Sequence, residues 1–341
     1  MNSYSPSFRN KVLDPKQNII MYETVPPKLG TPDDEMYKIA EKLAVRIKGI
    51  HIDAINIPEV RDENNRNGRP RPFPYVPITE PRIYGKILSE TAGLEHIERI
   101  INTVVVHYPH LEQWLYETWN DFSVRNLVLV GGESSSVQYP GPSVTEVAEL
   151  VRRSNLDYFL GGITIPERHI RKGDEPRRII RKSRRGIRFF TSQVIYDPKH
   201  TVKLFSDYSQ ECERNEEEPA RIFLSFSPFS TKREADFLEW LGAEIPYATR
   251  AIIRLLGVYD IVVSSKLLRW LDLDPLAARK SAQICRDNLK YILDHAINLK
   301  PRVPIGLNVE NVSRKKIVID TSVEMLGMLS KELEQFYKVS V

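Results

Sequence analysis

The sequence predicts a (β/α)8 barrel, or TIM barrel, of the α/β class. Eight apolar segments typical of strands alternate along the 341 residues with segments that have helical patterns. This alternation favours a parallel sheet covered by helices, and a barrel is the natural closure for eight strands. The chain contains no linker rich in Pro, Gly or Ser that would divide it. A doubly wound sheet is the alternative.

The expected strands are short runs rich in aliphatic and aromatic residues, bounded by polar or turn residues. The first, QNIIMYET, ends on a glutamate that two prolines follow closely. In chain order the strands are expected at 17–24, 49–57, 101–107, 124–133, 156–165, 187–197, 220–226 and 303–309.

The expected helices begin at residues that favour helix N-termini. Thr31 is the expected N-cap of the first helix, with Pro32 at its first position, and Ser143 and Glu146 are spaced as a capping box. Helices are expected at 31–47, 82–93, 110–120, 143–153, 174–186, 231–269 and 275–298.

The chain is expected to have one catalytic domain with short additions at both ends. Residues 1–15 are expected to form an N-terminal arm, and residues 16–312 the barrel. Residues 313–341 are expected to form a C-terminal strand-helix extension packed on the barrel or on a partner subunit. In this extension KKIVID (315–320) predicts a short strand, and 322–337 predicts an amphipathic helix.

The composition is typical of a soluble globular protein, with 41% hydrophobic and 28% charged residues. No apolar run reaches the roughly 20 residues that span a bilayer, and the first residues lack the apolar core of a secretory signal. Cys212 and Cys285 are too few for a disulfide framework or a cysteine-based metal site. We expect a cytoplasmic protein without a membrane segment.

Polar residues follow several expected strands, at the end where TIM barrels carry their function. Glu23 ends the first strand; it is either a structural carboxylate that accepts backbone amides or a general acid with a raised pKa. Neither His107 nor His169 has the spacing of a metal ligand, so no metal site is predicted. The polar residues expected near this rim are Glu23, Asp53, Asn56, His107, Glu133, His169 and Gln193.

The densest charge lies between residues 167 and 188, where eight arginines and two lysines occur. Three interpretations are open: a solvated helix face, a nucleic-acid surface, or a clamp for phosphates or a polyglutamate tail. Aromatic residues, which nucleic-acid surfaces interleave with basic ones, are absent between Arg168 and Arg188. The phosphate clamp is therefore preferred, and no nucleic-acid partner is expected.

The motifs, taken in order, resemble those of the methylenetetrahydrofolate reductase family. The resemblance extends from about residue 20 to residue 313, and YETVPP matches the family's aromatic-Glu-x-x-Pro-Pro pattern. The other motifs that carry it are HIDAIN, VRNLVLVGGE, IPERH, GIRFFTSQVIYD, DFLEWLGAEIP and LNVENVS.

The resemblance implies a TIM barrel that reduces the methylene bridge of a reduced pterin to a methyl group. The carrier is either tetrahydrofolate or tetrahydromethanopterin. Glu23 would be the general acid, and Glu133, Gln193 and Phe237 would bind the substrate. The residues at flavin-contacting positions are His107, Glu133, His169, Glu175, Arg178, Arg181 and Lys182.

The resemblance also implies FAD and a reduced nicotinamide, NAD(P)H, as the electron donor. Departures from the family pattern fall mainly on the flavin contacts, at Ile55, Gly131, Ile165 and Arg178. Direct hydride transfer without bound flavin is therefore an alternative. Two further alternatives are a catalytically silent barrel that serves as a subunit or regulator in one-carbon metabolism, and an RNA-binding protein. A homo-oligomer or a redox partner subunit is expected, and the loop at 58–81 is a candidate cap of the barrel.

Overall fold

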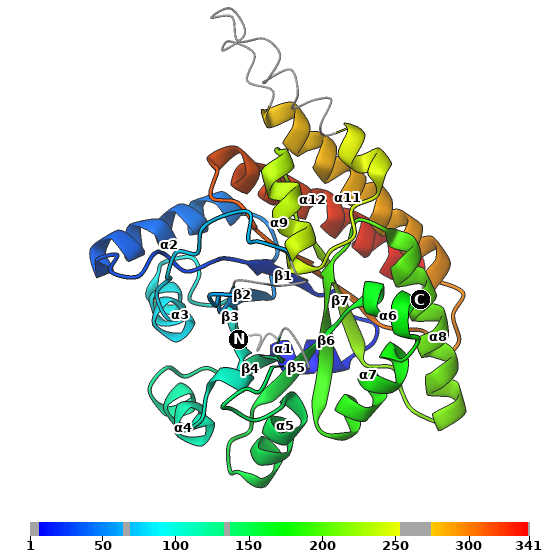
Figure 1. Ribbon diagram of the computed structural model, residues 1–341, viewed down its shortest axis with the longest axis horizontal. Coiled ribbons are helices and arrows are strands. Elements are labelled where there is room, and N and C mark those ends of the chain that lie inside the picture. Colours follow the sequence, from blue (N-terminus) through cyan, green and yellow to red (C-terminus); the bar gives the residue numbers. More distant parts are fainter. Residues whose placement is uncertain (1–6, 64–68, 133–136, 253–273, 340–341) are drawn as a thin grey trace, which may run out of the picture.

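The chain folds as a closed barrel of eight parallel strands surrounded by helices (Figure 1). The structure is a computed structural model that describes residues 7–63, 69–132, 137–252 and 274–339. The strands follow one another around the barrel in chain order, and β1 pairs with β8 to close it. The predicted (β/α)8 fold is confirmed.

All eight predicted strands are present, most of them shorter than the apolar runs that predicted them. Each run loses residues at its ends, where the chain turns into a loop or helix; only β3 begins earlier than expected. The strands are β1 (Ile20–Glu23), β2 (Ala54–Pro58), β3 (Glu98–Val104), β4 (Asn126–Val130), β5 (Phe159–Thr164), β6 (Ile187–Val194), β7 (Arg221–Phe226) and β8 (Ile305–Val309).

The helices lie outside the barrel. The expected N-cap at Thr31 is wrong by one residue, because α2 begins at Asp33 with Pro32 as its N-cap. The start of α5 is as its capping residues predict. In α5 the Ser143 side chain accepts from the Glu146 amide, and Glu146 accepts from the Ser143 amide, which completes the predicted capping box. The first helices are α1 (Phe8–Leu13), α2 (Asp33–Ile47), α3 (Pro81–Glu90), the 3-10 turn η2 (Val105–His107), α4 (Leu111–Asn120) and α5 (Val144–Arg153).

The helix expected over 174–186 is confirmed as α7, and a second helix, α6, precedes it in the basic segment at 167–188. Gly173 separates them in a left-handed conformation, with φ of 68°. The helix expected over 231–269 ends at Leu241, and part of that range lies outside the described residues. The remaining helices are α6 (Pro166–Lys172), α7 (Glu175–Arg184), α8 (Pro198–Asn215), α9 (Lys232–Leu241), α11 (Asp274–Ala296) and α12 (Lys316–Val339).

The predicted strand at 315–320 is wrong, because most of this segment belongs to α12. The β-branched run Ile317–Ile319 favours a strand locally, but Val318, Thr321 and Met325 are buried on one face of a helix. This helix packs on α11 and also contacts α2 and β8, so it covers the barrel wall between them. The domain boundaries at residues 15 and 312 stay predictions.

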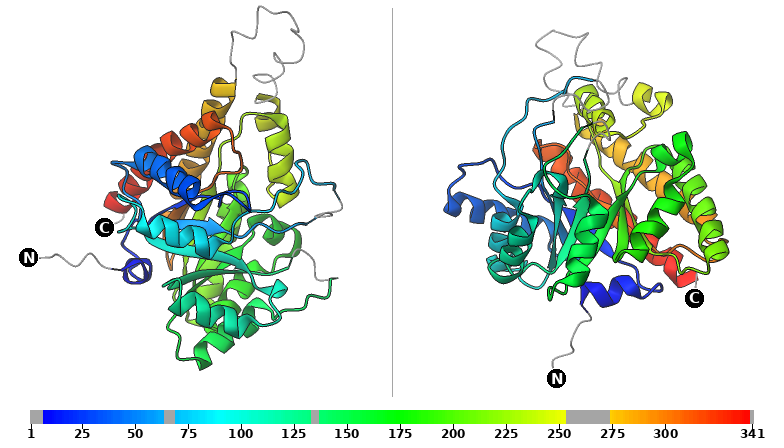
Figure 2. Two further views of the ribbon diagram at one scale, coloured as in Figure 1. Left: turned by 90° about the vertical axis from the view of Figure 1, so that its left-hand side faces the viewer. Right: turned by 60° about the horizontal axis from the view of Figure 1, so that its bottom comes forward.

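The lower half of the barrel interior is aromatic, and α1 covers it from below (Figure 2). Phe8 of α1 lies 6.1 Å or less, between ring centroids, from Phe159, Phe189 and Phe223. A Cβ on Gly161 would lie 2.4 Å from the Phe189 ring, so this position requires glycine. The aromatic plug fills the bottom of the barrel and leaves its polar residues to the other end.

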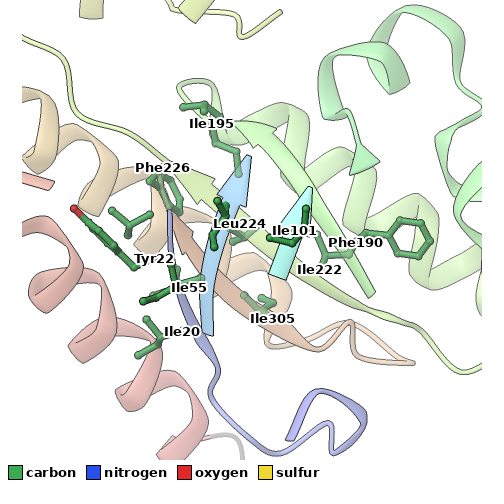
Figure 3. Packing of buried hydrophobic residues seen from close by; sticks show 14 of the residues in the cluster. Ile20, Tyr22, Ile55, Ile101, Phe190, Ile195, Ile222, Leu224, Phe226 and Ile305 are labelled. Atoms are coloured by element: carbon green, nitrogen blue, oxygen red, sulfur yellow. The ribbon is translucent and has the colours of Figure 1, made fainter. Parts of the chain in front are cut away.

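The outer faces of the strands carry the main apolar core, which packs beneath the helices. Figure 3 shows ten labelled members of this core, among them Ile20, Tyr22, Ile222 and Leu224. Tyr22 reaches α12, where its hydroxyl lies 3.0 Å from Ser322 Oγ. Among the described residues, no helix is long and apolar enough to cross a membrane.

Candidate functional site

The carboxyl ends of the strands form what we call the mouth of the barrel, and its inward side chains are polar. Side chains alternate between the two faces of a strand. Met21 and Ala54 belong to the inner cluster, so Glu23 and Asn56, two residues further along, also face inward. The other polar residues at inward positions of this upper layer are Asn102, Thr191, Gln193, Ser225, Asn308 and Glu310.

Glu23 lies at the end of β1 with only 8% of its surface exposed. Asn56 donates from Nδ2 to Glu23 Oε2 over 3.2 Å, and within the described residues no cation pairs with this carboxyl. Burial, followed by the nearby Glu310 carboxyl, raises the pKa of Glu23 well above its usual value. The raised pKa favours the protonated carboxyl, which is the state that a general acid needs.

Glu310 is a second carboxyl of the mouth, and the sequence interpretation missed it. It directly follows β8, and Asn308 donates from Nδ2 to Glu310 Oε1 over 2.9 Å. Burial raises the pKa of Glu310 to about 7, and the hydrogen bonds from Ser225 and Asn308 oppose that shift. In the sequence, the motif LNVENVS that contains Glu310 indicates only the end of the last strand.

Several buried polar atoms near the mouth lack a hydrogen-bond partner among the described residues. Asn56 Oδ1 and Asn308 Oδ1 are two of them, and both side chains have no exposed surface. Asn102 Oδ1 and Thr191 Oγ1 are two more. Buried polar groups are nearly always paired in folded proteins, so these unpaired acceptors are unusual features of the mouth.

Gln193 is held in place by contacts within the chain. Its Nε2 donates to the Leu241 carbonyl over 2.8 Å, and its Oε1 accepts from the Val194 amide over 2.9 Å. The register of β6 against β7 shifts between Thr191 and Val194, so Gln193 lies at an irregular point of the sheet. Irregularities of this kind re-aim side chains near functional sites.

Phe237 lies on α9 within an aromatic cluster that the loop at 58–81 helps to form. Its ring stacks on Trp240 with centroids 5.7 Å apart and meets Phe73 of the loop edge-on at 5.5 Å. Trp240 donates from Nε1 to the Arg69 carbonyl over 3.1 Å. The Arg71 guanidinium lies over both rings, 4.9 Å from the centroid of Trp240.

The described part of the loop at 58–81 borders one side of the mouth. The loop leaves β2, pairs with the β1–α2 connection at Lys28 and Ile78, and meets α9 after β7. Since β1 and β8 lie between β2 and β7 in the barrel, the loop spans the side that carries Glu23 and Glu310.

The two predicted histidines lie apart and have different surroundings. The rings of His107 and Tyr139 meet edge-on with centroids 5.4 Å apart. A Cβ on Gly132 would lie 2.2 Å from the Tyr139 ring. The Tyr139 ring therefore packs against the Gly132 backbone, where a larger side chain would clash with it. His169 lies on α6, is buried, and contacts Asp207 of α8 through Nε2 at 2.8 Å.

Glu175 and Arg178 lie at the start of α7, where Glu175 fastens the helix to β5. Glu175 is fully buried and accepts from the Thr164 hydroxyl, the Ile165 amide and the Arg168 guanidinium. The nearest approach of Arg178 Nε to Glu175 is 3.6 Å. These contacts give Glu175 a structural role in addition to any contact with a ligand.

Arg181 and Lys182, adjacent in the sequence, point in different directions. Lys182 donates from Nζ to the Ile163 carbonyl over 2.9 Å, and burial lowers its pKa to about 8. Arg181 is exposed and lines a groove of about 1100 Å³ between α4, α5 and α7. The structure does not bring these two cations together. Glu133, the remaining predicted residue, lies outside the described residues.

Comparison with solved structures gives a strong structural likeness. No protein-family model and no curated protein matches the chain. A protein of Clostridium thermocellum, which binds two copies of 5-methyl-5,6,7,8-tetrahydrofolic acid, is 24% identical with a TM-score of 0.74; the match covers 95% of this chain and 99% of that one. This likeness shows the fold.

Two weaker likenesses are to enzymes. Dihydropteroate synthase from Thermus thermophilus is 9% identical with a TM-score of 0.43, over 94% of this chain and 96% of that one. The oxygenating constituent of 3,6-diketocamphane monooxygenase from Pseudomonas putida, in complex with FMN, is 13% identical with a TM-score of 0.47, over 93% and 97%. At these scores neither likeness bears on the chemistry of the mouth.

Proposed function

We propose that the chain is an oxidoreductase of the methylenetetrahydrofolate reductase type. It reduces the methylene group of 5,10-methylenetetrahydrofolate or methylene-tetrahydromethanopterin to a methyl group by hydride transfer. The observation that carries the proposal is the buried Glu23 at the mouth of the barrel, with a pKa raised well above its usual value. The folate bound by the Clostridium thermocellum protein of the same fold supports the choice of substrate.

Glu23 has the properties that the first chemical step requires. Opening of the methylene bridge needs a proton on N10 of the pterin carrier, a weakly basic nitrogen. A carboxyl with a raised pKa keeps its proton at neutral pH and delivers it when the nitrogen comes within reach. The C–N10 bond then breaks, the N5 lone pair forms an iminium, and hydride adds to the carbon.

The unpartnered amide oxygens support a pterin as the ligand. A pterin ring carries N–H groups along one edge, and Asn56 Oδ1 and Asn308 Oδ1 are buried acceptors beside the two carboxyls. Gln193 and Phe237 are proposed as further substrate contacts, Gln193 through its amide and Phe237 through its ring. Glu133 is proposed as a contact of both substrate and cofactor.

The residues expected to hold FAD do not form a diphosphate site as they are arranged. Arg181 faces an outer groove, Lys182 is bound to the Ile163 carbonyl, and Glu175 is bound to Arg168. His169 is paired with Asp207. We therefore propose NAD(P)H as the direct hydride donor, with FAD as the alternative relay. A role as a silent subunit is less favourable, because a binding protein gains nothing from a buried, costly acid.

The test is an anaerobic assay of the purified full-length chain. The protein is mixed with either methylene-pterin and with NADH or NADPH, with and without added FAD, and the methyl product is measured by mass spectrometry. We expect methyl-pterin to form in proportion to the nicotinamide oxidised. If neither carrier gives a methyl product with any donor, the proposal is wrong. A colourless active protein would favour direct transfer.

A further inference from the structure

Glu23 and Glu310 extend side by side from neighbouring strands. Tyr22 pairs with Val309 in the parallel ladder of β1 and β8, so the next residues along the two strands are Glu23 and Glu310. The amide of Thr24 still donates to Asn56, and that of Glu310 to Phe226, so both chains keep their strand direction there. Neighbouring strands lie about 4.8 Å apart, and residues in register project to the same side.

We infer that Glu310 is a positioning residue for Glu23: the two carboxyls hold one proton between them, and the negative charge of Glu310 keeps that proton on Glu23. This inference rests on the proposed function for its role in the reaction. The pairing of the two carboxyls itself follows from the register of the strands and does not depend on any substrate.

Each carboxyl is oriented by an amide from an adjacent strand position. Asn56 of β2 donates to Glu23, and Asn308 of β8 donates to Glu310 while it also donates to Ser225 Oγ at 3.1 Å. The Asn308 amide therefore bridges β7 and the end of β8. The Asn56 and Asn308 amides therefore restrict the rotation of both carboxyl side chains at the mouth.

No described cation offsets the two charges. Within the described residues, Glu310 is the charged group that raises the pKa of Glu23, and the side chains that hydrogen-bond to Glu310 are the uncharged Ser225 and Asn308. Two neighbouring carboxylates with no cation beside them cannot both ionise cheaply, as in other carboxyl pairs that share a proton. Above about pH 7, where Glu310 ionises, a pair that still holds one proton has a net charge of −1.

This charge state suits the proposed proton transfer. The proton passes from Glu23 to N10, the C–N10 bond breaks, and its electron pair stays on N10. The carboxyl pair changes from −1 to −2, while the carrier gains one positive charge as the iminium forms. The negative charge of Glu310 is already present when the cation appears, so it opposes early loss of the proton and favours the charged product of the step.

The decisive experiment titrates the carboxyls directly in the full-length chain. Infrared difference spectra, recorded against pH, follow the protonated carboxyl band in the wild type, Glu310→Gln and Glu23→Gln. In Glu310→Gln we expect the remaining Glu23 carboxyl to lose its proton at a pH at least one unit lower than in the wild type. An unchanged midpoint would overturn the inference.

Glu167 supplies a matched control. It is a buried carboxyl on α6 whose pKa burial raises to about 7, so it titrates in the same range. Glu167→Gln identifies its band and is expected to leave the midpoint of Glu23 unchanged. A shift as large as that in Glu310→Gln would show a general effect of removing a buried charge, and would also overturn the inference.

Activity gives a second readout that separates the two proposals. In Glu310→Gln the alkaline limb of kcat/KM against pH is expected to move to lower pH, which lowers the rate at pH 8 by about tenfold per pKa unit. If the Glu23 midpoint shifts in Glu310→Gln but the wild type reduces no pterin, the carboxyl pair is supported and the proposed function is wrong. If the wild type reduces pterin but the midpoint does not shift, the proposed function is supported and the carboxyl pair is wrong.

Discussion

Asn56 Nδ2 lies 3.2 Å from Glu23 Oε2, so an amide in the middle of β2 orients the carboxyl that ends β1. The other carboxyl oxygen of Glu23 has no hydrogen-bond partner within the described residues, and it is the atom available to a ligand. The Asn56 amide holds one oxygen, and burial raises the pKa of the carboxyl. This arrangement is what a general acid needs before its substrate arrives.

Glu23→Gln is expected to abolish pterin reduction and to preserve ligand binding. Glutamine has the same shape but no acidic proton, so turnover should fall by at least about a hundredfold, while the affinity for methyl-pterin stays within about threefold. Stopped-flow assays and fluorescence titration measure the two quantities. Glu167→Gln is the control and should keep full activity. Turnover near the wild-type value in Glu23→Gln would remove the acid role.

The carboxyl pair should make the protein less stable as the pH rises. Burial raises the folded-state pKa of Glu310 from 4.5 to about 7, so the folded protein binds more protons than the unfolded chain between these values. The free energy of unfolding should therefore fall from about pH 4.5 to pH 7, by on the order of 3 kcal/mol from this group. Urea unfolding across this range measures the fall.

Glu310→Gln should remove most of that dependence. The variant should gain stability relative to the wild type at pH 8 and show little difference near about pH 3, where both carboxyls are protonated in the folded and the unfolded state. Glu41→Gln, at an exposed position of α2, serves as the surface control and should follow the wild type. Equal pH dependence in wild type and Glu310→Gln would contradict the assignment.

The fold could be predicted because eight apolar runs survive as strands, and because capping residues such as Ser143 mark helix starts. The error at 315–320 has a physical cause. Ile317, Val318 and Ile319 favour strands when read locally, but α12 can bury one face against α11, and that packing decides the structure. No local pattern in the segment contains this information.

The candidate site could be predicted only where position along one strand was enough. Glu23 was found because it ends an apolar run. Glu310 was missed because its partner lies almost the whole chain away, and only the register of β1 against β8 brings them together. Arg181 and Lys182 looked like a pair because they are adjacent, but successive helical residues point about 100° apart.

Separate substitutions of Arg181 and Lys182 should have different effects. Arg181→Ala should leave the affinity for NADPH and for FAD within about twofold, because its side chain lies on an outer groove. Lys182→Met should lower the stability by about 1 kcal/mol, because the Ile163 carbonyl loses its donor. Arg177→Ala, an exposed change on the same helix, is the control. An equal tenfold loss of cofactor affinity in the Arg181 and Lys182 variants would instead indicate a shared diphosphate site.

Trp240→Ala should loosen the loop that borders the mouth. Trp240 is 2% exposed, stacks on Phe237, lies beneath Arg71 and donates to the Arg69 carbonyl, so its loss removes the main anchor of the loop on α9. We expect a loss of about 3 kcal/mol in stability and at least tenfold faster hydrogen exchange in peptides that cover 69–80. Tyr247→Ala, which removes an aromatic ring that is 86% exposed, should change neither quantity.

Because the loop spans the side of Glu23 and Glu310, the Trp240 variant should also bind methyl-pterin more weakly. Unchanged exchange in 69–80 would mean that the loop is held chiefly by its pairing near Lys28.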